Sequence, residues 1–327
     1  PVLTRTVHSK LFYKDSIFAD KLKVTNEAFP RYVPNARVHT FHRFLPYNVF
    51  YEKNPEYYAL RGDKRLPTQL CLTNPDVLNI VKDSVNSFFN KFPASDVISV
   101  SQDDNTQYCQ CEKCSKIDIE EGSPAGTMIH FVNEVAKSFP DRTISTLAYQ
   151  YTRKPPKVKP IENVLITLCS IECDRSVPIE RGCKDFSSDL KGWSQLTDNI
   201  RIWDYTTQFT NFLAPFPNWG TLKPNINLFV DNNAKWIFEQ HSNNNSELFE
   251  LRSYIMAKLL WDPNLDFQSL LNQFNNRYYG SGGEYISEYV NNIQNQIDNT
   301  SFFLFLYGDP SQAFDSFLSP ENLINYD

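Results

Sequence analysis

The sequence lacks any run of roughly 18 apolar residues, the length that a membrane-spanning helix needs, so we expect no membrane insertion. It also lacks an excess of basic residues. There are 32 lysines and arginines against 38 aspartates and glutamates, which gives a formal net charge of −6. Because nucleic-acid-binding proteins carry basic surfaces, we expect no nucleic acid partner.

Several catalytic signatures are missing as well. The sequence has no glycine-rich phosphate-binding loop, and it has no Gly-x-Ser-x-Gly nucleophile elbow for acyl transfer. Histidines and aspartates do not cluster at the spacing of metal ligands. We therefore expect no cofactor for catalysis.

Aromatic residues, in contrast, are frequent: 17 tyrosines and 25 phenylalanines contribute most of an aromatic fraction of 14%. Such residues can fill a core, but their flat apolar faces also suit the C–H faces of sugars. The chain has 327 residues, of which 41% are hydrophobic. That length accommodates a (β/α)8 barrel of typically ~250 residues followed by a helical tail.

Four short apolar runs each end at acidic residues. Short β-branched and aromatic runs are typical of strands, and helical patterns lie between most of these runs. In a parallel barrel, the carboxyl ends of the strands meet on the face that carries the active site. The pattern therefore predicts one acidic pocket, although acids at strand ends also cap helices or lie in solvated turns. The runs and their acids are 97–101 with Asp103 and Asp104, 164–171 with Glu172, 200–203 with Asp204, and 235–238 with Glu239.

The order of these patterns predicts an α/β fold of the (β/α)8 TIM-barrel type. We expect the barrel over residues 1–262 and a helical extension packed on it over 263–327. Alternating polar and aromatic residues predict a strand at 38–45, and Asn74 predicts the start of a helix. The Lys/Pro-rich connection at 152–161 is too short for a full helix, so the expected barrel is somewhat irregular.

The seven cysteines include a dense cluster. Cys109, Cys111 and Cys114 lie within six residues, a spacing that suits tetrahedral zinc, with Cys173 as the fourth ligand if the two strand ends are neighbours. The alternatives are a disulfide between Cys173 and one of the three, as in a secreted protein, or reduced and partly buried thiols. Three or four thiolates leave zinc no open position for water, so such a site would be structural.

Parts of the sequence resemble known families. Residues 70–104 have an Asn-Pro-Asp helix start, a Phe-Pro helix end and a strand that runs into two acids, and they resemble the passage of family 20 β-hexosaminidases that carries the catalytic pair. Residues 236–261 resemble the last barrel strand and helix of such hydrolases. Residues 1–295 are similar throughout to the bacterial family named domain of unknown function 4838. Its phrases here are 54–60 (NPEYYAL), 108–114 (YCQCEKC), 145–156 (STLAYQYTRKPP) and 169–175 (CSIECDR).

These resemblances imply a glycoside-hydrolase-type barrel that acts on an oligo- or polysaccharide, either a hexosaminide or a uronide. They also imply a secreted or periplasmic protein, although the printed chain begins without a signal-peptide pattern. The Asp-Glu pair of the hexosaminidases corresponds here to Asp103 and Asp104, a shorter acid that argues against the acetamido-assisted mechanism. The resemblance to α-glucuronidases implies instead that the acid and the bases come from several strand ends.

A glycosidase needs one protonated and one ionised carboxyl group. We nominate Asp104 and Glu172 as this pair, with Glu239 as the next catalytic candidate. We expect Trp203 and Tyr205 to flank the site and the loop 209–219 to form a mobile aromatic wall, unless Trp203 fills the barrel interior. The rival interpretations are a non-catalytic glycan-binding barrel and a zinc-stapled interaction module. The expected substrate-binding residues are Asp103, His42, Arg43, Tyr149, Arg175, Trp203, Asp204, Tyr205 and Gln240.

Overall fold

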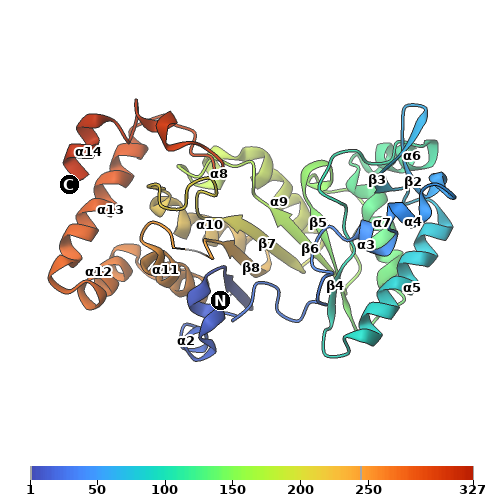
Figure 1. Cartoon of the computed structure of the whole chain (residues 1–327), viewed down its shortest axis with the longest axis horizontal. Helices are drawn as coiled ribbons and strands as arrows, with labels where there is room; N and C mark the ends of the chain where they lie inside the picture. The colour runs from blue at the N-terminus through green and yellow to red at the C-terminus, as the bar shows by residue number, and fades with distance from the viewer. Residues whose placement is uncertain (1, 244, 327) are drawn as a thin grey trace. The chain divides into compact units, whose positions relative to one another are not determined.

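The chain forms two compact α/β units (Figure 1). The computed structural model describes residues 2–243 and 245–326. The expected boundary between residues 262 and 263 stays a prediction. The two units have other bounds. Unit 1 comprises Pro1–Ala28, Ser170–Ser188 and Ile202–Asp327, and unit 2 comprises Phe29–Cys169 and Asp189–Arg201.

Six strands carry the fold, in the hydrogen-bonded order β1-β8-β7-β6-β5-β4. The pairs β1–β8, β4–β5 and β5–β6 are parallel, and helices occupy most of the connections, which confirms the α/β class. A closed ring of eight strands is not present in residues 2–243 and 245–326, so the expected (β/α)8 barrel is not seen. The strands are β1 (Thr4–Val7), β4 (Val97–Ser99), β5 (Thr143–Ala148), β6 (Val164–Cys169), β7 (Ile200–Tyr205) and β8 (Ala234–Gln240).

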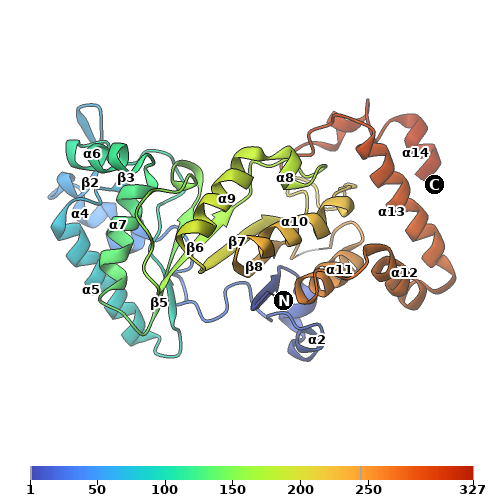
Figure 2. The same cartoon turned by 180° about the vertical axis from the view of Figure 1, so that it is seen from behind.

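In unit 1, helix α10 (Trp219–Asp231) packs on β8 and helix α11 (Phe249–Trp261) packs on β1. Both helices lie beside β8 when the molecule is seen from the front and from behind (Figures 1 and 2). Helices α12 (Phe267–Tyr278) and α13 (Gly283–Asp298) pack against each other, which confirms the helices expected after residue 263. The smaller elements are α1 (Lys10–Lys14), α2 (Ser16–Lys21), α8 (Ile179–Gly182), η3 (Gly280–Gly282), η4 (Pro310–Ala313) and α14 (Pro320–Tyr326).

In unit 2, helix α5 (Pro75–Lys91) begins where the sequence predicts. The side chain of Asn74 accepts a hydrogen bond from the backbone N–H of Asp76, and Pro75 occupies the first turn. Its buried stripe consists of Val77, Val81, Val85 and Phe89. The other elements are α3 (Phe41–Phe44), α4 (Tyr47–Phe50), η1 (Pro55–Tyr57), α6 (Glu112–Glu121), α7 (Ala125–Ala136) and η2 (Gln150–Thr152), while α9 (Lys184–Leu196) begins in unit 1 and ends in unit 2.

An antiparallel hairpin in unit 2 was not expected from the sequence. Strands β2 (Tyr58–Arg61) and β3 (Lys64–Leu70) pair across a turn in which Gly62 has a φ of 56°. Only glycine adopts this left-handed conformation at little cost, so the turn depends on that residue. The hairpin ends one residue before Cys71, and this position matters for the thiol cluster described below.

The strand expected at residues 38–45 is wrong, because this segment contains the short helix α3. His39 has a φ of 51°, and a residue in the left-handed region interrupts an extended backbone. Phe41 and Phe44 are both buried, and their separation of three positions fits one helical turn as well as it fits a strand. His42 and Arg43 are exposed.

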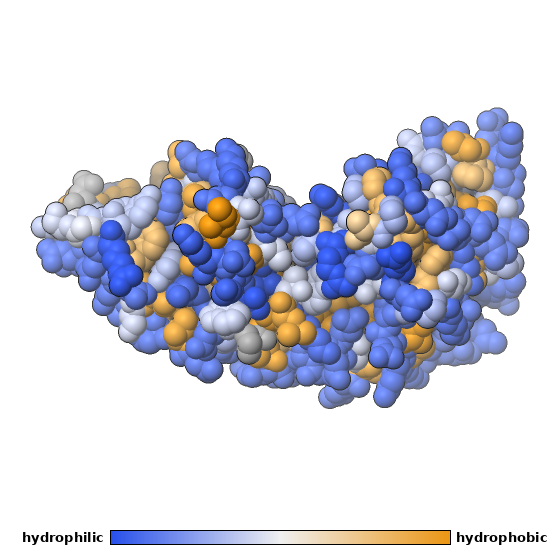
Figure 3. Space-filling model, turned by 90° about the horizontal axis from the view of Figure 1, so that it is seen from below, coloured by the Kyte–Doolittle hydropathy of each residue, from blue (hydrophilic) through white to orange (hydrophobic). Residues whose placement is uncertain are grey.

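Hydrophilic residues cover most of the face shown in Figure 3, and apolar residues form separate patches on it. Among the described residues, no helix is long and apolar enough to cross a membrane.

Candidate functional site

A buried ion pair in unit 1 joins the end of β7 to the segment that begins at Ser170. Asp204 is the penultimate residue of β7, and Ser170 and Arg175 follow the end of β6. Nη1 of Arg175 lies 2.6 Å from Oδ1 of Asp204, and the Ser170 hydroxyl donates to the same oxygen. The side chains of Arg175 and Asp204 are only 2% and 4% exposed. One oxygen of Asp204 therefore accepts hydrogen bonds from both a guanidinium and a hydroxyl group.

A second carboxyl group lies at the end of the adjacent strand, in different surroundings. Glu239 is the penultimate residue of β8 and is 1% exposed. Neither of its carboxyl oxygens makes a hydrogen bond to another described residue. Burial raises the pKa of Glu239 well above its usual range, the charge of Asp204 raises it further, and Arg175 opposes the shift. Burial and the neighbouring Asp204 thus both favour the protonated form of Glu239.

The alternation of side chains along the strands separates this pair from the neighbouring aromatic residues. Asp204 and Glu239 share one face with buried isoleucines at 202 and 237, and helices α10 and α11 pack on the strands of this unit. Trp203 and Gln240 point to the other face. All four residues lie at the carboxyl ends of β7 and β8.

Trp203 is held in a fixed orientation on its face. Its indole Nε1 donates a 2.6 Å hydrogen bond to Oε1 of Gln240. The ring meets Phe238 edge-on at 5.0 Å between centroids and lies nearly parallel to Tyr205 at 6.4 Å. Trp203 remains half-buried, so part of a rigidly oriented aromatic surface is left open. That Trp203 and Tyr205 flank a substrate site stays a prediction.

The aromatic contacts continue outward from Tyr205 as a chain of rings. Successive centroids lie 5.8–6.2 Å apart along Tyr205, Phe209, Tyr307, Phe305 and Phe303. The last three are 55%, 37% and 53% exposed. They line a hollow of about 570 Å³ together with Glu172, which is itself exposed. We call the six rings from Trp203 to Phe303 the aromatic chain.

Sequence reasoning found only the first half of the aromatic chain. Phe209 belongs to the loop that was expected to form an aromatic wall, but Phe216 and Trp219 at its far end are buried. Phe303, Phe305 and Tyr307 were missed, because they lie in an irregular segment after α13. The unusual density of aromatics in FFLFLY at 302–307 was the available signal.

Unit 2 contains the remaining candidates. Nδ1 of His42 lies 2.6 Å from Oδ1 of Asp103. Burial raises the pKa of Asp103, and the bond to His42 opposes the shift. Asp104 is exposed, and the amide of Gln150 donates to it at 3.5 Å and to the Tyr149 hydroxyl at 3.1 Å. Burial and the charge of Asp104 raise the pKa of Tyr149 above its usual value.

The structure therefore divides the predicted site residues between the two units. Arg175, Trp203, Asp204, Tyr205, Glu239 and Gln240 come together in unit 1, which also holds Glu172. The histidine, arginine, tyrosine and aspartate candidates of the first half belong to unit 2. The prediction that Asp104, Glu172 and Glu239 line one pocket stays a prediction.

The expected partner of the cysteine cluster is wrong. Cys173 forms a disulfide with Cys183, ten residues later. The fourth thiol beside Cys109, Cys111 and Cys114 is that of Cys71, which the β2–β3 hairpin brings to the cluster. The four sulfur atoms lie within 4.8 Å of one another and could hold a metal ion. Sequence spacing had favoured Cys173 because the contribution of the hairpin was not visible.

The chain is similar to solved structures of glycoside hydrolases. One is a family 89 enzyme from Clostridium perfringens in complex with its substrate GlcNAc-α-1,4-galactose (12% identity, TM-score 0.48, 79% of this chain and 28% of that one). Another is a family 138 enzyme targeting pectin rhamnogalacturonan II (10% identity, TM-score 0.46, 72% and 30%). A third is the family 89 enzyme from Clostridium perfringens in complex with PUGNAc (11% identity, TM-score 0.43, 74% and 24%).

This chain thus spans less than a third of the length of each of these proteins. No curated protein matches its sequence. The family described as domain of unknown function (DUF4838) matches residues 4–291, most of the chain. The chain belongs to the DUF4838 family.

Proposed function

We propose that this chain acts on an oligo- or polysaccharide as a glycoside hydrolase whose substrate lies along the aromatic chain of unit 1. The observation that carries this proposal is the continuous row of six rings, from the oriented Trp203 to the exposed Phe303, with the carboxyl group of Glu172 in the same hollow. Flat apolar rings accept the C–H faces of sugars, and carboxylates accept hydrogen bonds from their hydroxyl groups.

We propose that two carboxyl groups of unit 1 share the roles that glycoside hydrolysis requires. Glu172 is exposed in the hollow and is proposed as the nucleophile or base. Burial and the charge of Asp204 raise the pKa of Glu239, and a raised pKa suits a general acid.

Arg175 and Asp204 are proposed to hold the two groups in place. Arg175 lies three residues after Glu172, and its backbone N–H donates to the carbonyl of Leu304 within the aromatic segment. Its side chain anchors this loop to Asp204, next to Glu239. The pair thereby connects the loop of Glu172, the aromatic segment and the end of β8.

The experiment is a screen of the purified chain against chromogenic glycosides and uronides, followed by the variants Glu172→Gln and Glu239→Gln on any substrate that is cleaved. We expect each variant to lose about 100-fold or more in kcat, since general acid–base catalysis contributes on that order. Glu284→Gln, at an exposed position of α13, is the matched control and should keep full activity. Unchanged turnover in Glu239→Gln would contradict its role as the acid.

The near-complete burial of Glu239 favours a second candidate, a glycan-binding unit without turnover. In that case oligosaccharides bind to the wild-type chain, as measured by isothermal titration calorimetry, but no reducing ends are released. Replacing Glu239 with Gln then leaves affinity unchanged, whereas removal of aromatic-chain residues weakens it.

We also propose that the protein is exported. The Cys173–Cys183 disulfide supports this, because oxidising compartments form and keep such bonds. Fractionation of the native host checks it: recovery of the protein in the cytosolic fraction alone would contradict export.

A further inference from the structure

We propose that Cys71, Cys109, Cys111 and Cys114 bind one Zn²⁺ ion as a structural tetrathiolate site that fastens the β2–β3 hairpin to the loop carrying Asp103 and Asp104. The site lies wholly within unit 2. It is independent of the proposed glycan chemistry, and its test does not use activity.

The sulfur positions fit a metal better than they fit disulfides. All four sulfur atoms lie within 4.8 Å of one another, and the sulfurs of Cys71 and Cys111 are 3.7 Å apart. Zinc–sulfur bonds of about 2.3 Å in a tetrahedron give an edge of about 3.8 Å. A disulfide needs about 2.05 Å, and two disulfides would divide the four sulfurs into two pairs. The observed arrangement is one compact group of four.

Helix α6 favours thiolates at two of the four positions. Cys111 is its N-cap residue, and Cys114 lies in its first turn. The unpaired N–H groups and the positive end of the helix dipole stabilise negative sulfur there. Cys71 follows β3 directly and Cys109 lies two residues before Cys111, so two backbone segments that are distant in sequence supply the ligands.

The surroundings of the cluster also suit a metal thiolate. The backbone N–H of Leu60 donates to the sulfur of Cys109 at 3.4 Å, and Oγ1 of Thr73 lies 3.3 Å from that of Cys114. Nη1 of Arg65 lies 3.9 Å from the sulfur of Cys109. Four thiolates and one Zn²⁺ leave a net charge of about −2, which such donors and one cation offset.

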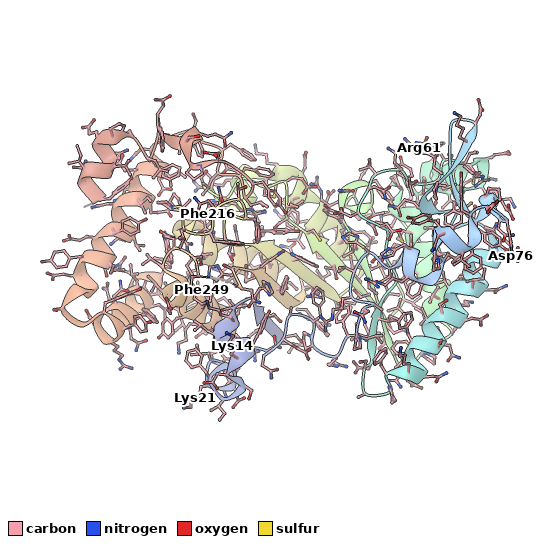
Figure 4. All side chains as sticks on the ribbon, in the orientation of Figure 1. Lys14, Lys21, Arg61, Asp76, Phe216 and Phe249 are labelled. Atoms are coloured by element: carbon pink, nitrogen blue, oxygen red, sulfur yellow. A yellow bond between two sulfur atoms is a disulfide. The ribbon has the colours of Figure 1, made fainter. Side chains whose placement is uncertain are left out.

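The apolar core around these cysteines is small, so a metal would supply stability that packing does not. The buried cluster consists of Ala59 with Cys71, Cys109 and Cys114, and only Leu60 and Cys111 pack against it as partly buried residues. Figure 4 labels Arg61 at the end of β2, in the same hairpin. Zinc binding that contributes to folding is typical of such sites.

The β2–β3 hairpin is hydrogen-bonded to the loop that carries Asp103 and Asp104. Gln69, two residues before Cys71, accepts a 3.0 Å hydrogen bond from the N–H of Asp103 and donates to the carbonyls of Asp103 and Asn105. A metal that fixes Cys71 therefore fixes the backbone at Asp103.

The first test is the zinc content of the full-length chain, purified without chelators and measured by inductively coupled plasma mass spectrometry. We expect about one zinc per chain in the wild type and almost none in Cys71→Ser and Cys111→Ser. Cys169→Ser is the matched control, because Cys169 is a buried cysteine outside both the cluster and the disulfide, and it should keep its zinc. Zinc that persists at about one per chain in both cluster variants would overturn the assignment.

A second measurement uses the wild-type chain, so that the proposal can be tested even if the variants fail to fold. Cobalt exchanged for zinc should give the absorption of tetrahedral Co²⁺–thiolate. After denaturation under chelation, five thiols should react with Ellman's reagent, because the Cys173–Cys183 disulfide accounts for two of the seven cysteines. A count of three or one would reveal disulfides within the cluster and sink the proposal, as would a protein that takes up neither metal.

Discussion

Nη1 of Arg175 lies 2.6 Å from Oδ1 of Asp204 where two strands end, and both side chains are almost wholly buried. A buried ion pair stabilises little in net terms, because its desolvation offsets its attraction, but removing one partner leaves an uncompensated charge. We therefore infer that this ion pair holds the neighbouring segments of unit 1 in position. It links the segment that carries Glu172 to the strand next to Glu239.

Asp204→Asn should lower the free energy of unfolding by about 3–5 kcal/mol, because the Arg175 guanidinium then stays buried without its counter-charge. Urea denaturation at neutral pH measures this loss. Asp96→Asn is the matched control, since Asp96 pairs with Arg31 at the surface, where the side chains are 32% and 57% exposed. Exposed pairs contribute about 0–1 kcal/mol. Equal losses in the two variants would contradict the special role of the buried pair.

Glu239 should make the stability of the protein fall as pH rises. Its pKa is raised in the folded state, whereas an unfolded glutamate titrates near about 4.3. Above that pH, unfolding releases a proton, so the stabilisation is complete at lower pH and declines by up to about 1.4 kcal/mol per pH unit until the folded pKa is reached. Glu239→Gln keeps the shape but cannot ionise. Its stability relative to the wild type should therefore increase between pH 5 and pH 8.

Urea denaturation at several pH values tests this expectation. The control is Glu284→Gln at its exposed position on α13, which should follow the wild type throughout. A stability difference between Glu239→Gln and the wild type that does not change with pH would show that Glu239 is ionised in the folded protein.

Trp203→Ala should weaken glycan binding and leave most of the stability in place. Trp203 is only half-buried, and its indole is oriented by the bond to Gln240. Trp193, at 1% exposure, provides the comparison for a core tryptophan, and Trp193→Ala should cost about 3–5 kcal/mol. Thermal melting and calorimetric titration with oligosaccharides separate the two effects. If Trp203→Ala destabilises as much as Trp193→Ala and binds glycan normally, Trp203 is a core residue.

Local signals in the sequence predicted local structure well. The start of α5 follows from Asn74 and Pro75 alone, because a helix cap needs only neighbouring residues. Asp204 and Glu239 lie on the adjacent strands β7 and β8, as expected for acids at neighbouring strand ends. The raised pKa of Glu239 could not be predicted from the sequence, because it depends first on burial and then on Asp204.

The predictions from the sequence were wrong mainly where segments far apart in the sequence determine the local structure. Cys71 lies 38 positions before Cys109, and only the unforeseen β2–β3 hairpin brings their sulfurs together. At residues 38–45, aromatic residues spaced three apart suited both a strand and a helical turn, and the left-handed backbone of His39 decided between them. The last three rings of the aromatic chain lie in irregular backbone, which has neither the helical nor the strand periodicity that a sequence can reveal.

Tyr307→Ala should weaken the binding of oligosaccharides about tenfold, equivalent to about 1.4 kcal/mol. The reason is position: Tyr307 belongs to the aromatic chain and lines the hollow that also holds Glu172. Titration calorimetry in the Glu172→Gln background avoids hydrolysis during the measurement. Tyr285→Ala is the control, because Tyr285 on α13 is 66% exposed, against 55% for Tyr307. Equal losses for Tyr285→Ala and Tyr307→Ala would show that the aromatic chain does not bind the glycan.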